Sequence, residues 1–118
     1  MLGVEEFNIY GLRKLQNANM NYMLLQSLEV AEISFIVMPL IIDADGINLK
    51  DATEICNQIG IKNHQEATFF GILSMKSKEI TINLKAPIIL DCKNQLAWQV
   101  VMSDNKYCVE HSLLKMSD

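Results

Sequence analysis

Apolar residues along this chain fall mostly in short runs and alternating stretches, which predicts strands more often than helices. The clearest case is residues 80–84, where isoleucine and leucine alternate with threonine and asparagine, as in a half-buried strand. Residues 22–28 alternate in the same way, and residues 33–38 form an apolar run short enough for a buried strand. Further strands are expected at residues 8–15, 67–75, 88–90 and 96–102.

One segment has the spacing of a helix, from Asn48 to Ile59. Asn48 is a suitable N-cap, and Asp51 can reach back toward it in a variant of the capping box. Gly60 follows, where a left-handed C-terminal cap belongs. The apolar residues that recur at helical spacing are Leu49, Ala52, Ile55, Cys56 and Ile59.

The remaining segments are expected to be irregular. Residues 1–7 are interpreted as a lead-in and residues 107–118 as a short mixed tail. Pro39 should end a strand ladder or lie at an edge, and Pro87 should interrupt the strand that contains it. Polar clusters predict turns at residues 16–19, 43–46, 91–95 and 103–105.

These elements predict a mostly β fold. Short strands, tight turns and one main helix at about residues 48–59 favour a small twisted sheet or a partly closed β-barrel. The 118 residues contain no linker or repeat, so a single domain spanning residues 1–118 is expected.

Composition narrows the classes of function. The chain carries 10 basic and 14 acidic residues, a net charge of −4, and Arg13-Lys14 is the only adjacent basic pair. Nucleic-acid binding is therefore not expected, whereas a basic protein partner would suit the acidic surface. The longest apolar stretch, residues 33–42, falls short of the ~20 residues of a membrane span. No secretory signal is visible, so a cytoplasmic location is expected.

No pattern of catalytic, metal-binding or cofactor-binding residues is found. The cysteines Cys56, Cys92 and Cys108 lack the spacing of a zinc or redox site, and buried free thiols are expected. His64 is interpreted as a surface residue and His111 as a side chain that holds the tail by a hydrogen bond. The chain is therefore not expected to be an enzyme.

Several segments resemble the FliW family of flagellar assembly factors. Residues 25–29 and 33–39 are similar to the family's LQSLEDPELSFVVIDP segment, and residues 80–90 to its MTANLKAPIVIN segment. Residues 99–114 resemble QVVLDNSDYPIRHPLL, and residues 2–6 resemble the LPGFEE lead-in. The order and spacing of these blocks match over nearly the whole chain.

The resemblance implies a protein that works by binding other proteins. FliW-like proteins bind flagellin in the cytoplasm before its export, and they bind the translational regulator CsrA and relieve its repression of flagellin synthesis. The chain departs from the family pattern at several positions. Met38 replaces an aspartate, Gly46 and Ile47 replace a tyrosine and a glutamate, and Glu110 and Ser112 replace an arginine and a proline.

The partner surface is expected at the edge formed by residues 39–45. Pro39 and Leu40 would bring apolar chain to the rim beside two acids, Asp43 and Asp45. The same acids could instead belong to a solvated turn after a core strand. The chain is expected to be a monomer when no partner is bound.

Three residues outside this edge are further candidates for partner contacts. Asn83 and Glu29 are supporting candidates, although the Asn83 amide could instead satisfy backbone groups freed by Pro87. Trp98 could be a core residue or an interface residue.

Two other classes of function remain open. The chain could be a FliW-like interaction domain with changed partners, as the departures suggest. It could also be a small-ligand or enzyme domain, which would need a concave polar site where His111, Cys108 and Asp104 converge.

Overall fold

The computed structural model describes residues 3–14, 22–27, 34–44, 46–76, 78–91, 93–103 and 106–115. Within these ranges the chain forms seven strands, one α-helix and one short 3-10 helix. The elements are β1 (Gly3–Lys14), β2 (Met23–Ser27), β3 (Ser34–Leu40), α1 (Leu49–Ile59), η1 (His64–Glu66), β4 (Ala67–Lys76), β5 (Glu79–Asp91), β6 (Leu96–Val101) and β7 (His111–Lys115).

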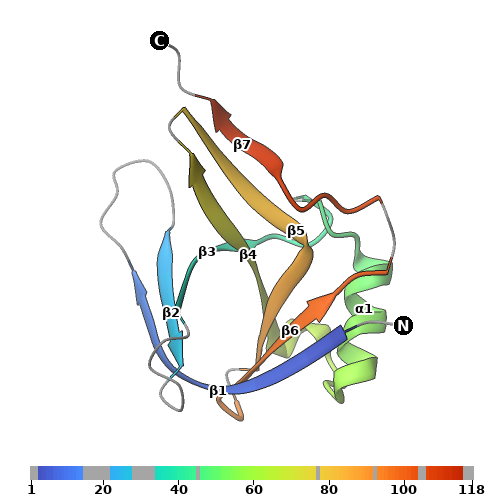
Figure 1. The fold of residues 1–118 in the computed structure, drawn as a ribbon. Helices are drawn as coiled ribbons and strands as arrows, with labels where there is room; N and C mark the ends of the chain where they lie inside the picture. Colours follow the sequence, from blue (N-terminus) through green and yellow to red (C-terminus); the bar gives the residue numbers. More distant parts are fainter. Residues whose placement is uncertain are drawn as a thin grey trace.

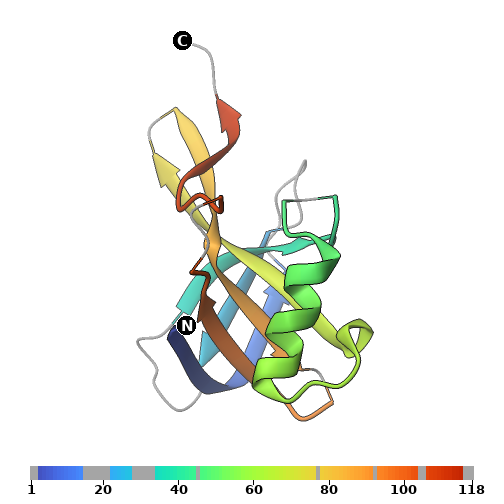
Figure 2. The same ribbon diagram turned by 90° about the vertical axis from the view of Figure 1, so that its right-hand side faces the viewer.

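The described strands form one antiparallel sheet in the order β4-β3-β2-β1-β6-β5-β7. β4 also pairs with β5, so the sheet curls back on itself as a half-barrel (Figure 1). α1 lies across one face of this sheet (Figure 2). The predicted class, mostly β with one main helix, is confirmed.

Each face of the sheet has its own apolar cluster. Successive residues of a strand point to opposite faces, and Phe69 belongs to one cluster while Phe70 belongs to the other. The same alternation separates Ala97 from Trp98, which confirms Trp98 as a core residue. The smaller cluster is built around Leu25, Val37, Phe70, Ile88, Leu90 and Ala97. The larger one also contains the buried residues of α1, so the helix is held by its apolar stripe.

α1 begins and ends as its sequence predicts. The Asn48 side chain accepts a hydrogen bond from the Asp51 backbone N–H at 2.8 Å. Gly60 adopts the left-handed conformation, with φ of 86°, that ends the helix. The prediction for Leu49 was wrong. Leu49 lies in the first turn of α1 and is 42% exposed, so it does not join the buried apolar stripe.

β5 is interrupted near Pro87, as expected. Its pairing with β4 passes from Phe70–Ile88 to Ile72–Asn83, so residues 84–87 bulge out of the ladder. The side-chain amide oxygen of Asn83, Oδ1, accepts hydrogen bonds from the backbone N–H groups of Lys85 and Ala86, at 2.9 and 3.0 Å. The interpretation that this amide satisfies freed backbone groups is therefore confirmed.

Both predicted irregular ends contain strands. Gly3–Phe7 of the supposed lead-in pairs with Ala97–Val101 of β6. The supposed mixed tail contains β7, which pairs with β5 from Ile82–His111 to Glu79–Lys115. Both predictions were wrong because these strands are set by partners far away in the sequence, which local patterns do not reveal.

One of the two expectations for Pro39 was that it ends a strand ladder. Pro39 does not end the pairing of β3 with β4. β3 continues to pair with β4 through Pro39–Phe70 and Leu40–Phe69. The pairing of β3 with β2 stops earlier, at Val37. Pro39 therefore lies past the end of β2, where its missing N–H removes no bond to that strand.

Candidate functional site

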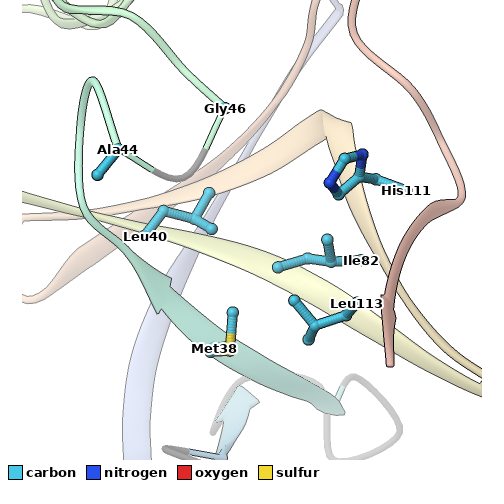
Figure 3. Close-up of a pocket in the computed structure, with 7 residues that line it drawn as sticks. All are labelled: Met38, Leu40, Ala44, Gly46, Ile82, His111 and Leu113. Carbon is cyan, nitrogen blue, oxygen red and sulfur yellow. The ribbon is translucent and has the colours of Figure 1, made fainter. Parts of the chain in front are cut away.

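An apolar groove of about 330 Å³ opens between the segment after β3 and strand β7. β3, the 41–47 loop, β5 and β7 all contribute to its lining (Figure 3). We call this feature the groove. Its lining residues are Met38, Leu40, Ala44, Gly46, Ile82, His111 and Leu113.

The floor of the groove depends on a glycine in β4. Gly71 pairs with Met38 of β3 and has no side chain to fill the space above it. A Cβ atom at Gly71 would lie 2.4 Å from both Cγ1 and Cδ1 of Ile82. The groove residue Ile82 therefore packs directly against the glycine, and a larger residue at position 71 would force the Ile82 side chain to shift.

The 41–47 loop has a backbone shape fixed by its own hydrogen bonds. The Asp43 N–H donates to the Ile47 carbonyl at 2.7 Å, and the Ala44 N–H donates to the Ile41 carbonyl at 3.0 Å. Asp43 adopts a left-handed conformation with φ of 70°, which Asp tolerates better than most residues. Gly46 has φ of 108°, and a Cβ atom there would lie 2.7 Å from Cδ1 of Leu84.

Asp43 also connects this loop to the helix. Its Oδ1 atom accepts a hydrogen bond of 2.6 Å from the backbone N–H of Leu49, the first residue of α1. This bond satisfies one of the unpaired N–H groups at the helix start. Asp43 is exposed, so one carboxylate both caps the helix and places negative charge beside the groove.

The opposite wall is held by the connection from β6 to β7. The Met102 N–H donates to the Lys85 carbonyl at 2.7 Å, and the Leu84 N–H donates to the Cys108 carbonyl at 2.9 Å. Both bonds join the connection to the bulge in β5. The wall residues His111 and Leu113 are therefore placed by main-chain contacts.

A polar cluster ties the same connection to α1. The Tyr107 hydroxyl donates a hydrogen bond to Oδ2 of Asp51, and Lys106 Nζ lies 2.9 Å from that oxygen. Lys106 Nζ also lies 5.1 Å from the centre of the Tyr107 ring, within the range of a cation–π contact. The expected capping box is thus only half formed. The Asn48 side chain accepts from the Asp51 N–H, but the Asp51 carboxylate contacts Tyr107 and Lys106 and does not reach back toward Asn48.

This environment shifts two pKa values in opposite directions. The hydrogen bond from Tyr107, together with Lys106, lowers the pKa of Asp51 below its ordinary value. Burial and the Asp51 carboxylate raise the pKa of Tyr107 to about 12. The neutral phenol and the ionised carboxylate therefore stabilise each other.

Comparison with known proteins identifies the family. The sequence model described as FliW protein matches residues 1–113. The flagellar assembly factor FliW of Clostridium botulinum (strain Alaska E43 / Type E3) is 31% identical over 117 residues, which cover 98% of this chain and 82% of the relative. The chain belongs to the FliW family. The prediction from the resembling segments is thereby confirmed.

Two further matches agree with this membership. The flagellar assembly factor FliW of Clostridium novyi (strain NT) is 35% identical over 98 residues, covering 80% of this chain and 67% of the relative. A crystal structure of the flagellar assembly factor FliW superposes with a TM-score of 0.58 at 21% identity. It covers 84% of this chain and 71% of that one, and at this identity it supports the fold alone.

The FliW family consists of non-catalytic assembly factors, which confirms the prediction that the chain is not an enzyme. Cys56 is 1% exposed and packs in the larger core cluster, and this burial raises the pKa of its thiol. Cys108 is exposed, contrary to expectation, because it lies on the β6–β7 connection. Cys92 lies outside the described residues. Across the described ranges, no group of three or more His, Cys, Asp and Glu side chains could hold a metal ion.

The two histidines occupy different settings. His64 is half-buried at the start of η1. His111 is exposed on the groove wall, and its backbone pairs with Ile82, so the tail is held by strand pairing.

Among the described residues, no helix has the length and apolar character that a membrane span requires.

The predicted partner residues are only partly brought together. Leu40 lines the groove, half-buried Pro39 precedes it, and Asp43 lies in the adjoining loop. Asn83 follows the groove residue Ile82, but its side-chain amide oxygen accepts hydrogen bonds from the backbone N–H groups of Lys85 and Ala86. Glu29 and Asp45 lie outside the described residues.

Sequence reasoning missed most of the groove lining. Met38 and Ile82 were predicted to be ordinary strand residues and Leu113 to be part of a mixed tail, and only the three-dimensional arrangement places them around the groove. Gly71 was the available signal, since a glycine in a strand often marks a close approach.

Proposed function

We propose that this protein is a flagellar assembly factor that binds flagellin in the cytoplasm and antagonises a CsrA-type translational regulator. The observation that carries the proposal is the family match over residues 1–113. Relatives named flagellar assembly factor FliW, which align with 98% and 80% of the chain, support it further. Binding would be the whole mechanism, with no chemical step.

The proposed partner surface is the groove together with the edge of residues 39–45. Ile41, which follows the groove residue Leu40, is 69% exposed and adds apolar surface to this edge. The exposed carboxylate of Asp43 adds negative charge. An apolar centre with a polar rim is the usual composition of a protein interface.

Supporting roles are proposed for residues outside this edge. Asn83 would act indirectly, by holding the bulge that follows Ile82. Glu29 and Asp45 would contribute acidic contacts to a basic partner. The protein would work as a cytoplasmic monomer with a single domain over residues 1–118.

The direct test is a titration of the purified chain with flagellin and with the CsrA-type regulator of the same genome. Saturable binding to each is expected. Addition of the chain to a complex of the regulator with flagellin leader RNA should release the RNA, and added flagellin should reverse that release. Absence of binding to both proteins would contradict the proposal.

A second candidate is a FliW-like interaction domain with changed partners. Met38 and Gly46, two of the positions at which the chain departs from the resembling segments, both line the groove. Glu110 and Ser112, two further departures, flank the groove residue His111. Capture from native cytosol distinguishes the candidates, because recovery of a different protein without flagellin or the regulator would favour changed partners.

A further inference from the structure

The groove has the size and lining to take apolar side chains. Apart from Gly46 and the His111 imidazole, the lining residues are aliphatic: Met38, Leu40, Ala44, Ile82 and Leu113. An apolar cavity of about 150 Å³ holds a benzene molecule. The groove, at about 330 Å³, therefore has room for two large apolar side chains.

The groove is also preformed on both sides. Its loop wall is fixed by the Asp43–Ile47 and Asp43–Leu49 hydrogen bonds, and its β7 wall by main-chain bonds to the bulge in β5. A rigid site avoids the entropic cost of ordering on binding. A partner segment could therefore insert without rearrangement of the described backbone.

The charges that lie next to the lining residues in the chain are mainly acidic. Asp43 and Asp45 flank Ala44, and Glu110 precedes His111. Asp43 and Glu110 are both exposed. The nearest Lys or Arg in the sequence is Lys115, two positions after Leu113. A partner segment that carries Lys or Arg beside its apolar residues would complement both this acidic rim and the chain's net charge of −4.

We propose that the groove binds a short partner segment in which two neighbouring apolar side chains are flanked by Lys or Arg. The two apolar side chains fill the hollow above Ile82, and the basic residue lies near Asp43. This inference rests on the proposed function, since it specifies which feature of flagellin or of the regulator the chain recognises. It makes the groove, and not the sheet edge alone, the determinant of partner choice.

The test fills the groove in the full-length chain. Ala44→Phe adds an aromatic ring from the loop, and His111→Trp narrows the hollow from the opposite wall. Both positions are exposed, so folding should be retained. Thr53→Phe is the matched control, because it adds the same ring on an exposed face of α1 outside the groove lining.

The probes are intact flagellin, the intact regulator and overlapping peptides that tile both proteins. Ala44→Phe and His111→Trp should each weaken binding about tenfold or more, equivalent to about 1.4 kcal/mol, while Thr53→Phe should leave it unchanged. The peptides that bind should contain paired apolar residues next to Lys or Arg. Asp43→Asn keeps the acceptor for Leu49 but removes the charge, so it should slow association at low salt, whereas Glu54→Gln on α1 should not.

The outcomes separate this inference from the proposed function. Loss of binding in both groove-filled variants, with Thr53→Phe intact, supports the inference. Wild-type affinity in both folded variants overturns it and leaves the proposed function standing. Binding peptides without basic residues, or a concentration-dependent dimer that Ala44→Phe abolishes, would also overturn it. A wild-type chain that binds neither flagellin nor the regulator would overturn both.

Discussion

Replacement of Tyr107 by phenylalanine tests how the β7 wall of the groove is held. Tyr107 is 4% exposed, and its hydroxyl donates to the Asp51 carboxylate of α1. The substitution removes this hydroxyl and leaves the ring in place, so the packing of the core should be retained. The contact joins positions 56 residues apart, and its loss should loosen the β6–β7 connection from the helix.

The expected cost follows from the chemistry of the contact. A hydrogen bond to a charged group contributes about 1.5–3 kcal/mol. The Asp51 side chain is 18% exposed and retains Lys106, so the lower end of this range applies, about 1.5 kcal/mol. For a domain of this size, that corresponds to a fall of roughly 6 °C in melting temperature.

The pH dependence of stability gives a second readout with a defined sign. The pKa of Tyr107 is raised from 10 to about 12, so its contribution is complete below pH 10 and is lost as the pH rises toward 12. The pKa of Asp51 is lowered from 3.8, so its contribution is complete above that value and is lost as the pH falls below it. The stability advantage of the wild type over Tyr107→Phe should therefore shrink at alkaline pH, and its advantage over Asp51→Asn should shrink at acid pH.

Denaturant unfolding of wild type and variants at several pH values measures both effects. Lys106→Met is the comparison, since Lys106 is 48% exposed and its ion pair should contribute less than about 1 kcal/mol. Equal stability of Tyr107→Phe and wild type at neutral pH would refute the reasoning. So would a difference between them that stays constant from pH 7 to pH 12.

Three further substitutions test other parts of the structure. Ile55→Asp places an unpaired charge in the core, where Ile55 is 2% exposed, and should cost about 3 kcal/mol or more; a melting temperature close to wild type would contradict this burial. Asp43→Ala should cost about 1–2 kcal/mol through loss of the bond to Leu49, whereas Asp43→Asn should be nearly neutral in thermal unfolding. Gly71→Ala should shift the side chain of the groove residue Ile82 and weaken partner binding, and equal binding in a folded variant would contradict the dependence of the groove on Gly71.

Features encoded by neighbouring residues were predicted well. Helix α1, its Asn48 cap and its Gly60 end depend on residues a few positions apart, and all three are confirmed. The response of β5 to Pro87 was also predicted, because Asn83 lies close enough to bond the freed N–H groups itself.

Features that depend on distant partners were not predicted. Gly3–Phe7 and β7 become strands because β6 and β5 offer edges, and neither segment has a strong alternating pattern of its own. The Asp51 carboxylate contacts Tyr107 and not the neighbouring Asn48, since the fold places a buried hydroxyl beside it. Asp43 was expected to contact a partner or to lie in a solvated turn, yet its carboxylate also caps α1.

The candidate site shows the same division. The exposed edge after Pro39 could be predicted from the sequence, because an apolar strand is followed first by a proline and then by Asp43 and Asp45. The groove could not, because its lining comes from β3, β5 and β7, which the fold brings around Gly71 of the intervening strand β4. The contacts proposed for Glu29 and Asp45 stay predictions.

The measurement that tests the central proposal most directly is calorimetric titration of the full-length chain with flagellin and, separately, with the CsrA-type regulator from the same genome. The account predicts saturable binding to both and weakened binding of each by Ala44→Phe but not by Thr53→Phe. Heats no greater than dilution for both proteins, from a chain shown to be folded by circular dichroism, would contradict it.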